Sequence, residues 1–155
     1  MGVIIGLATG AAKGIAKLVG IFSAEKRADE RQRYPKIEAQ CDIIDKSSIP
    51  FTNPTFHHRR LENGNDLEHR RLSEFAQKIN DAMSSIQRIA SPELRKAMYE
   101  LHQSCLGILM EHWDDNIEPE DLSQEIKNHR LAITKEVIDH RRTFNREANR
   151  QLRLK

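Results

Sequence analysis

The chain has 155 residues, of which 31% are charged and 5% aromatic, and its formal net charge is +2. So small a net charge is not typical of a nucleic-acid-binding protein, and two cysteines, Cys41 and Cys105, cannot build a disulfide framework, which favours a reducing compartment. The scarcity of aromatic residues and of alternating β-branched runs favours an all-α domain of ordinary size.

The first 22 residues, MGVIIGLATGAAKGIAKLVGIF, carry glycines at a strict four-residue spacing. These are Gly2, Gly6, Gly10 and Gly14. In a helix they would form one ridge without side chains. Each interior Gly costs a water-exposed helix about 1 kcal/mol relative to Ala, so the regular stripe indicates another role. Such a ridge lets a second helix backbone approach closely, as small-xxx-small motifs do in membranes.

As a helix, this segment would also be amphipathic. The apolar face contains Ile4, Leu7, Ala11, Ile15, Leu18 and Phe22. The opposite face contains Thr9, Lys13, Lys17 and Gly20. Residues 3–22 would extend for about 30 Å, the thickness of a hydrocarbon core, but on an insertion scale the two lysines offset the gain from the large apolar side chains.

Two arrangements in a membrane fit this pattern. The helix can lie in the interface of an anionic bilayer, or several copies can insert with their glycine ridges packed together. Lys13 and Lys17 would then face lipid head groups or a water-filled lumen. Two other interpretations stay open: a secretory signal, although its charges would come first, and a soluble helix buried in a bundle, where Gly allows tight packing.

Further along, we expect the first helix to continue to Tyr34 and to end before Pro35. Residues 36–45 are predicted to form a short helix with Ile37, Cys41 and Ile44 on one side. Residues 46–65 contain prolines and an Asn-Gly pair, and are predicted to be an irregular loop and a candidate hinge.

Three amphipathic helices are expected to follow. The first contains Leu72, Phe75, Ala76, Ile79, Met83, Ile86 and Ala90 at three- to four-residue spacing. Ser91 and Pro92 then provide an N-cap and a first helical residue, and the second helix contains Leu94, Ala97, Met98, Leu101, Cys105, Ile108, Leu109 and Trp113. The third is opened by the break at Pro119 and contains Leu122, Ile126, Ile133, Val137 and Phe144, before a basic, frayed tail.

These elements predict an antiparallel helical bundle of four to five helices with an N-terminal glycine-zipper amphipathic helix. Within a single domain, we assign residues 1–34 to a membrane-active or assembly helix. Residues 35–65 form a short helix and loop, and residues 66–155 form the bundle core with its basic C-terminal tail.

Signals for chemistry are weak. His102, Cys105 and His112 could share one helix face, but a zinc site usually needs four ligands with paired spacing, so we interpret them as core or boundary residues and expect no metal and no cofactor. A nucleophilic pair of Cys105 and His102 would face the core, where a thiol is usually inert. No phosphate-binding, dinucleotide or hydrolase motif is present in the sequence, and we expect no enzymatic activity.

Basic patches lie at Arg59-Arg60, 69–71 and 140–142, and in the C-terminal tail. Interleaved acids weaken their use for duplex DNA, so a nucleic-acid partner is disfavoured. Solvated helix faces explain the patches, and attraction to anionic lipid head groups is the functional alternative.

The glycine ridge of Gly2, Gly6, Gly10 and Gly14, followed by amphipathic helices, resembles the HeLo-like family of cell-death execution domains. This family occurs in fungal incompatibility proteins, with counterparts in bacterial defence proteins and in necroptosis executioners. The resemblance covers residues 2–22 closely and the remaining chain only in general architecture. It implies a pore or membrane lesion made by oligomerised N-terminal helices, without catalysis.

The sequence thus favours a membrane-targeting, pore-forming effector that is cytoplasmic at rest and moves to a membrane when active. Its expected partners are anionic membrane lipids, further copies of itself and a regulatory protein. The alternative is a non-enzymatic structural or interaction protein, such as a phage ejection or virion component or an adaptor, whose N-terminal helix mediates self-assembly. A nucleic-acid-associated bundle is a third, weaker interpretation.

Overall fold

The computed structural model describes residues 33–56, 67–114 and 122–153, with the side chains of residues 112–114 excepted. Residues 33–48 are helical, and η1 (Ile49–Thr52), α2 (Leu67–Ile86), α3 (Pro92–Asp114) and α4 (Gln124–Arg153) follow. No strand occurs within these ranges. The chain divides into two units, Met1–Pro35 and Lys36–Lys155. The core and the candidate sites described here belong to the second unit.

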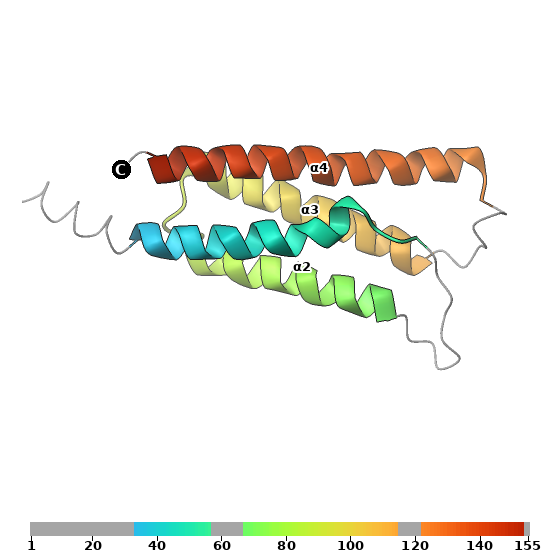
Figure 1. Ribbon diagram of the computed structural model, residues 1–155, viewed down its shortest axis with the longest axis horizontal. Coiled ribbons are helices and arrows are strands. Elements are labelled where there is room, and N and C mark those ends of the chain that lie inside the picture. The colour runs from blue at the N-terminus through green and yellow to red at the C-terminus, as the bar shows by residue number, and fades with distance from the viewer. Residues whose placement is uncertain (1–32, 57–66, 115–121, 154–155) are drawn as a thin grey trace, which may run out of the picture. The chain divides into compact units, whose positions relative to one another are not determined.

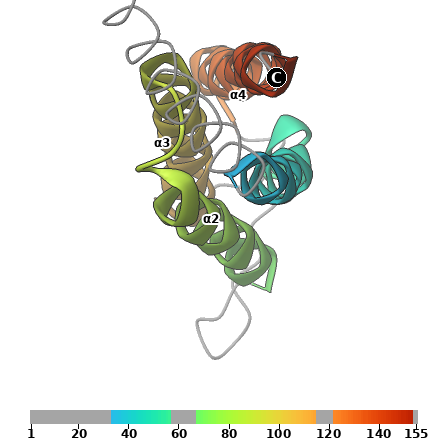
Figure 2. The same ribbon diagram turned by 90° about the vertical axis from the view of Figure 1, so that its left-hand side faces the viewer.

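Neighbouring helices of this second unit alternate in direction. Residues 36–48 and α3 run one way along the bundle, whereas α2 and α4 run the other way (Figure 1). Seen along their axes, the helices surround a common interior (Figure 2). The predicted all-α antiparallel bundle is confirmed, while the expected N-terminal glycine-zipper helix lies outside the described residues.

Each helix contributes an apolar stripe to one core, because residues three and four apart lie on the same helix face. Helix α2 buries Leu72, Ala76, Ile79, Ala82 and Ile86. Helix α3 buries Leu94, Ala97, Met98, Leu101, Cys105, Ile108 and Leu109, and α4 buries Val137, Phe144 and Ala148. Residues 36–52 add Ile37, Cys41, Ile44 and Phe51. The predicted stripes of the first two amphipathic helices, and of residues 36–45, are therefore buried as expected, with two exceptions. Helix α2 ends at Ile86, so the buried Ala90 lies in the following turn rather than in the helix, and the side chain of Trp113 lies outside the described residues.

The turn between α2 and α3 is held by Ser91, which lies in the turn, and by Gln151 near the C-terminal end of α4. The Ser91 hydroxyl accepts a hydrogen bond from the amide of Leu94 at 3.1 Å, as predicted for an N-cap. Gln151 of α4 binds the same turn twice: its amide oxygen accepts from the Ser91 amide at 2.9 Å, and its amide nitrogen donates to the Ile89 carbonyl at 3.2 Å. The last turns of α4 thereby hold the α2–α3 turn.

Two boundary predictions in residues 33–52 are corrected. The helical residues 33–48 include Pro35, so the expected break there does not occur, although the division between the two units falls after it. The segment predicted to be irregular from residue 46 is helical to residue 48 and continues as η1, with Phe51 fully buried. Burial of Phe51 makes residues 46–52 part of the core rather than a hinge; residues 57–65 lie outside the described residues.

The last helix begins later and ends later than its pattern predicts. Helix α4 starts at Gln124, where the Ser123 hydroxyl accepts from the Ile126 amide at 3.2 Å. It continues to Arg153 rather than fraying beyond Phe144, because Ala148 is buried, Leu152 packs on the core and Gln151 binds the α2–α3 turn.

Candidate functional site

The residues predicted from the sequence to act in membrane insertion and helix packing all lie in the first 22 positions. They are Gly2, Gly6, Gly10, Gly14, Ile4, Leu7, Ile15, Leu18 and Phe22, with Lys13 and Lys17 for head groups or a lumen. All of them lie outside the described residues, so the structure does not bear on their arrangement. The described residues that could form a site belong to the bundle.

Charge is distributed unevenly over the bundle. Helix α4 contains eight Lys and Arg residues against four Asp and Glu. Helix α2 is balanced, with three of each sign, and α3 has two basic residues against four acidic ones. The positive charge of the bundle is therefore concentrated on α4, which makes this helix the natural contact for an anionic partner.

The middle of α4 is joined to residues 36–48 by one polar node. The Asp45 carboxylate accepts from the Arg141 guanidinium and from the Asn145 amide, both at 2.9 Å. Less than a third of the Asp45 and Arg141 side chains is exposed. The main-chain carbonyl of Asp45 also accepts from the Ser48 hydroxyl at 2.7 Å. This node orients the end of the first helical segment, where the chain turns into η1.

Nearer its N-terminus, α4 carries a buried arginine. Arg130 is 6% exposed, and its guanidinium carbon lies 4.8 Å from the centroid of the Phe56 ring. Burial lowers the pKa of Arg130 from its ordinary value, and the negative charge of Glu111 opposes that shift. Glu111 of α3 also contacts His129 of α4, with 2.9 Å between Oε1 and Nε2. The ring and the carboxylate both stabilise a cation that would otherwise be costly to bury.

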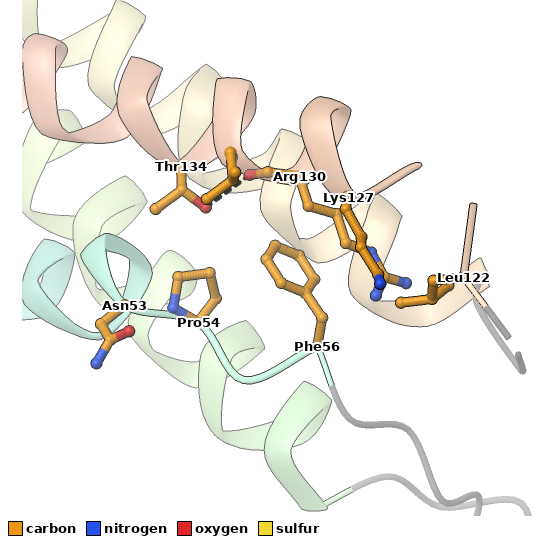
Figure 3. A pocket seen from close by; sticks show the side chains of 8 residues that line it. Asn53, Pro54, Phe56, Leu122, Lys127, Arg130 and Thr134 are labelled. Atoms are coloured by element: carbon orange, nitrogen blue, oxygen red, sulfur yellow. Dashed lines mark hydrogen bonds between the residues drawn. The ribbon is translucent and has the colours of Figure 1, made fainter. Parts of the chain in front are cut away.

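A cavity of about 350 Å³ lies between the chain after η1 and the first turns of α4. It is lined by Asn53, Pro54, Phe56, Leu122, Lys127, Arg130, Leu131 and Thr134. In Figure 3 the Phe56 ring lies between Pro54 and the side-chain nitrogen atoms of Lys127 and Arg130, which approach Leu122. The cavity thus combines apolar walls with two basic side chains, and none of its described lining residues is acidic.

A second hollow, of about 300 Å³, lies further along the same helix. It is lined by Thr52, Ile138, Arg141 and Arg142. Here Arg141 is already bound to Asp45, and Arg142 approaches Asp139 at 3.9 Å. Because carboxylates already contact both arginines, this hollow is the weaker anion site of the two.

The buried thiols and the half-buried His102 do not form a reactive centre. Burial raises the pKa of Cys41 and that of Cys105 to about 12 each, so both thiols stay protonated at neutral pH. Burial lowers the pKa of His102, and its hydrogen bond to the backbone of Ala76 opposes that shift. Within the described ranges, no three His, Cys, Asp or Glu residues are placed to hold a metal ion.

Comparison with known proteins finds no family model, no curated protein and no solved structure that matches this chain. Among helices in the described part of the chain, none is both long enough and apolar enough to cross a bilayer.

The cavity at Phe56 is the feature that sequence reasoning missed. The stretch IPFTNPTF contains two prolines and was therefore predicted to be a loop, without any signal that its aromatic ring would meet a residue of the last helix. Arg130 does fall on the apolar stripe of α4, seven residues before Val137 and fourteen before Phe144. A basic residue on such a stripe is a signal that could have pointed to this site.

Proposed function

We propose that this protein is a membrane-permeabilising effector whose N-terminal segment oligomerises through its glycine ridge, with the bundle as a scaffold. The supporting observation is that the bundle's core is assembled from side chains between Ile37 and Ala148. These side chains belong to the unit Lys36–Lys155, which is separate from Met1–Pro35. We take the N-terminal segment, which lies in the other unit, to serve a purpose other than that of the bundle.

In this proposal the glycines set the distance between neighbouring N-terminal helices, and the apolar face from Ile4 to Phe22 contacts the acyl chains. Lys13 and Lys17 face lipid phosphates or the lumen of the assembly. The basic residues of α4 support attraction to an anionic leaflet, since each Lys or Arg near such a surface contributes about 1 kcal/mol. No catalytic step is involved, and the protein stays in the cytoplasm until it is recruited to a membrane.

Dye release from anionic vesicles tests this proposal. A Gly6→Leu/Gly10→Leu variant places two bulky side chains on the glycine ridge. We expect leakage to fall at least about tenfold, because the backbones of neighbouring N-terminal helices can no longer approach each other closely. The matched control is Ala8→Leu/Ala11→Leu, which also introduces two leucines, but away from the glycine ridge at Ala11 of the apolar face and at the neighbouring Ala8. We expect this control to leak as much as the wild type.

Equal leakage from both variants would show that the glycine ridge has no role in permeabilisation. If sedimentation shows assembly that depends on the ridge but not on vesicles, the protein is instead a structural or adaptor protein whose N-terminal helix mediates self-assembly. These two results separate the effector from its alternative.

A further inference from the structure

We propose that the cavity lined by Phe56 and Lys127 is a binding site for a small anionic amphiphile, namely a carboxylate with a single apolar chain or ring. This inference is independent of the membrane function proposed above, because it concerns only described residues of the bundle.

The apolar part of such a ligand would contact one wall of the cavity. Pro54 and the half-buried Phe56 contribute to this wall from the chain after η1, and Leu131 contributes from α4. Leu131 is 69% exposed, the largest value among the exposed large hydrophobic residues of the described chain. A ligand in the cavity would remove part of Leu131 and Phe56 from water, which supplies the hydrophobic contribution to binding.

The acidic head of the ligand would be bound by Lys127. This lysine lies three residues before Arg130, so the two side chains are neighbours on one face of α4. Lys127 makes no ion pair with any residue in the described ranges, whereas Arg130 is stabilised by the Phe56 ring and by Glu111. Two like charges in a cavity whose described lining residues include no acid favour an anion there.

The polar and apolar groups are arranged in the order that an amphiphile requires. Figure 3 shows the nitrogen atoms of Lys127 and Arg130 beside Leu122, with the Phe56 ring next to them and Pro54 beyond the ring. A head group at the lysine would therefore place its chain along the ring and towards Pro54. Small-molecule sites span about 300–1,000 Å³, and a volume of about 350 Å³ fits a single-chain or aromatic acid better than a two-chain lipid.

Isothermal titration of the full-length protein with sodium decanoate, below its micelle-forming concentration, tests the proposal. We expect Lys127→Glu to weaken decanoate binding at least about tenfold, because it replaces an attractive charge with a repulsive one. Lys135→Glu is the matched control: Lys135 is also exposed on α4 and lacks an ion pair within the described ranges, but it does not line the cavity. It should bind decanoate within about twofold of the wild type.

Three results would overturn the inference. Lys127→Glu and Lys135→Glu could bind decanoate equally well, or decyltrimethylammonium could bind as tightly as decanoate, which would show that the charge of the head group is irrelevant. A third result is that only vesicles containing anionic lipid, and not decanoate, distinguish the two variants; the lysine would then contact a membrane surface rather than a small ligand. Leakage of vesicle contents plays no part in this test, so its outcome does not depend on the proposed function.

Discussion

At the scale of single residues, Asp45 shows how the bundle uses a partly buried carboxylate. Its carboxylate accepts two hydrogen bonds from α4, whereas Asp42, one turn earlier, only forms an exposed pair with Lys46 at 2.9 Å. Exposed pairs of this kind contribute little, because water and salt screen them. The two aspartates therefore have the same chemistry in different environments.

We expect Asp45→Ala to lower the free energy of unfolding by about 1–2 kcal/mol, since two bonds from α4 to a partly buried carboxylate are lost. Asp42→Ala should change it by less than about 0.5 kcal/mol. Urea denaturation of both variants measures the difference, and equal losses would mean that the Asp45 node does not stabilise the bundle.

His102 makes the stability of the bundle depend on pH. Burial lowers its pKa in the folded protein below the ordinary value, so on acidification the unfolded chain takes up this proton first. The contribution of neutral His102 is complete above about pH 6.5 and is lost as the pH falls through the lowered pKa.

We therefore expect the wild type to lose more stability than His102→Gln when urea midpoints are compared at about pH 7.5 and about pH 5. Glutamine is also polar and keeps a side-chain donor for the backbone of Ala76. If the two midpoints shift in parallel over this range, the pH dependence arises elsewhere.

At the scale of elements, periodicity predicted where helices lie better than where they end. The stripes of α2 and α3 recur regularly and mark faces that are indeed buried, and Ser91-Pro92 is a local signal for the start of α3. The end of α4 depends instead on Gln151, whose partners lie about sixty residues earlier in the chain. Contacts of this kind leave no local pattern, so the last turns could not be predicted.

For η1, local sequence rules predict an irregular loop, whereas the structure has a short helix with a buried Phe51. Prolines and polar residues surround Phe51, which favours a loop by local rules, yet the tertiary contacts of one aromatic side chain place the segment in the core. Phe56, five residues further on, contacts Arg130 of α4 without any local signal of its own, so the sequence marks only the Arg130 side of the candidate site.

We expect Phe51→Ala to cost about 3–5 kcal/mol, because truncating a fully buried aromatic residue leaves a cavity. Ile49→Ala, in the same turn but 47% exposed, should cost less than about 1 kcal/mol. Thermal or urea unfolding compares the two, and a small effect at Phe51 would restore residues 46–52 as a hinge.

At the scale of the whole molecule, two units carry different kinds of sequence. Lys36–Lys155 contains the core and the net basic α4, whereas the glycine ridge belongs to Met1–Pro35. The fold class followed from the composition and stripes of the larger unit. The proposed activity depends on the smaller unit. Its pattern of Gly, Lys and apolar residues is suited to contact with a membrane or with another copy of the same segment.

Dye release from anionic vesicles, comparing the full-length protein with a chain that lacks residues 1–22, shows whether the N-terminal segment permeabilises membranes. We predict leakage from the full-length protein and none from the shortened chain, and we expect the shortened chain to unfold cooperatively because the described core residues remain. Equal leakage from both chains, or leakage from neither together with no binding to the vesicles, would contradict the claim that the N-terminal helix acts on membranes.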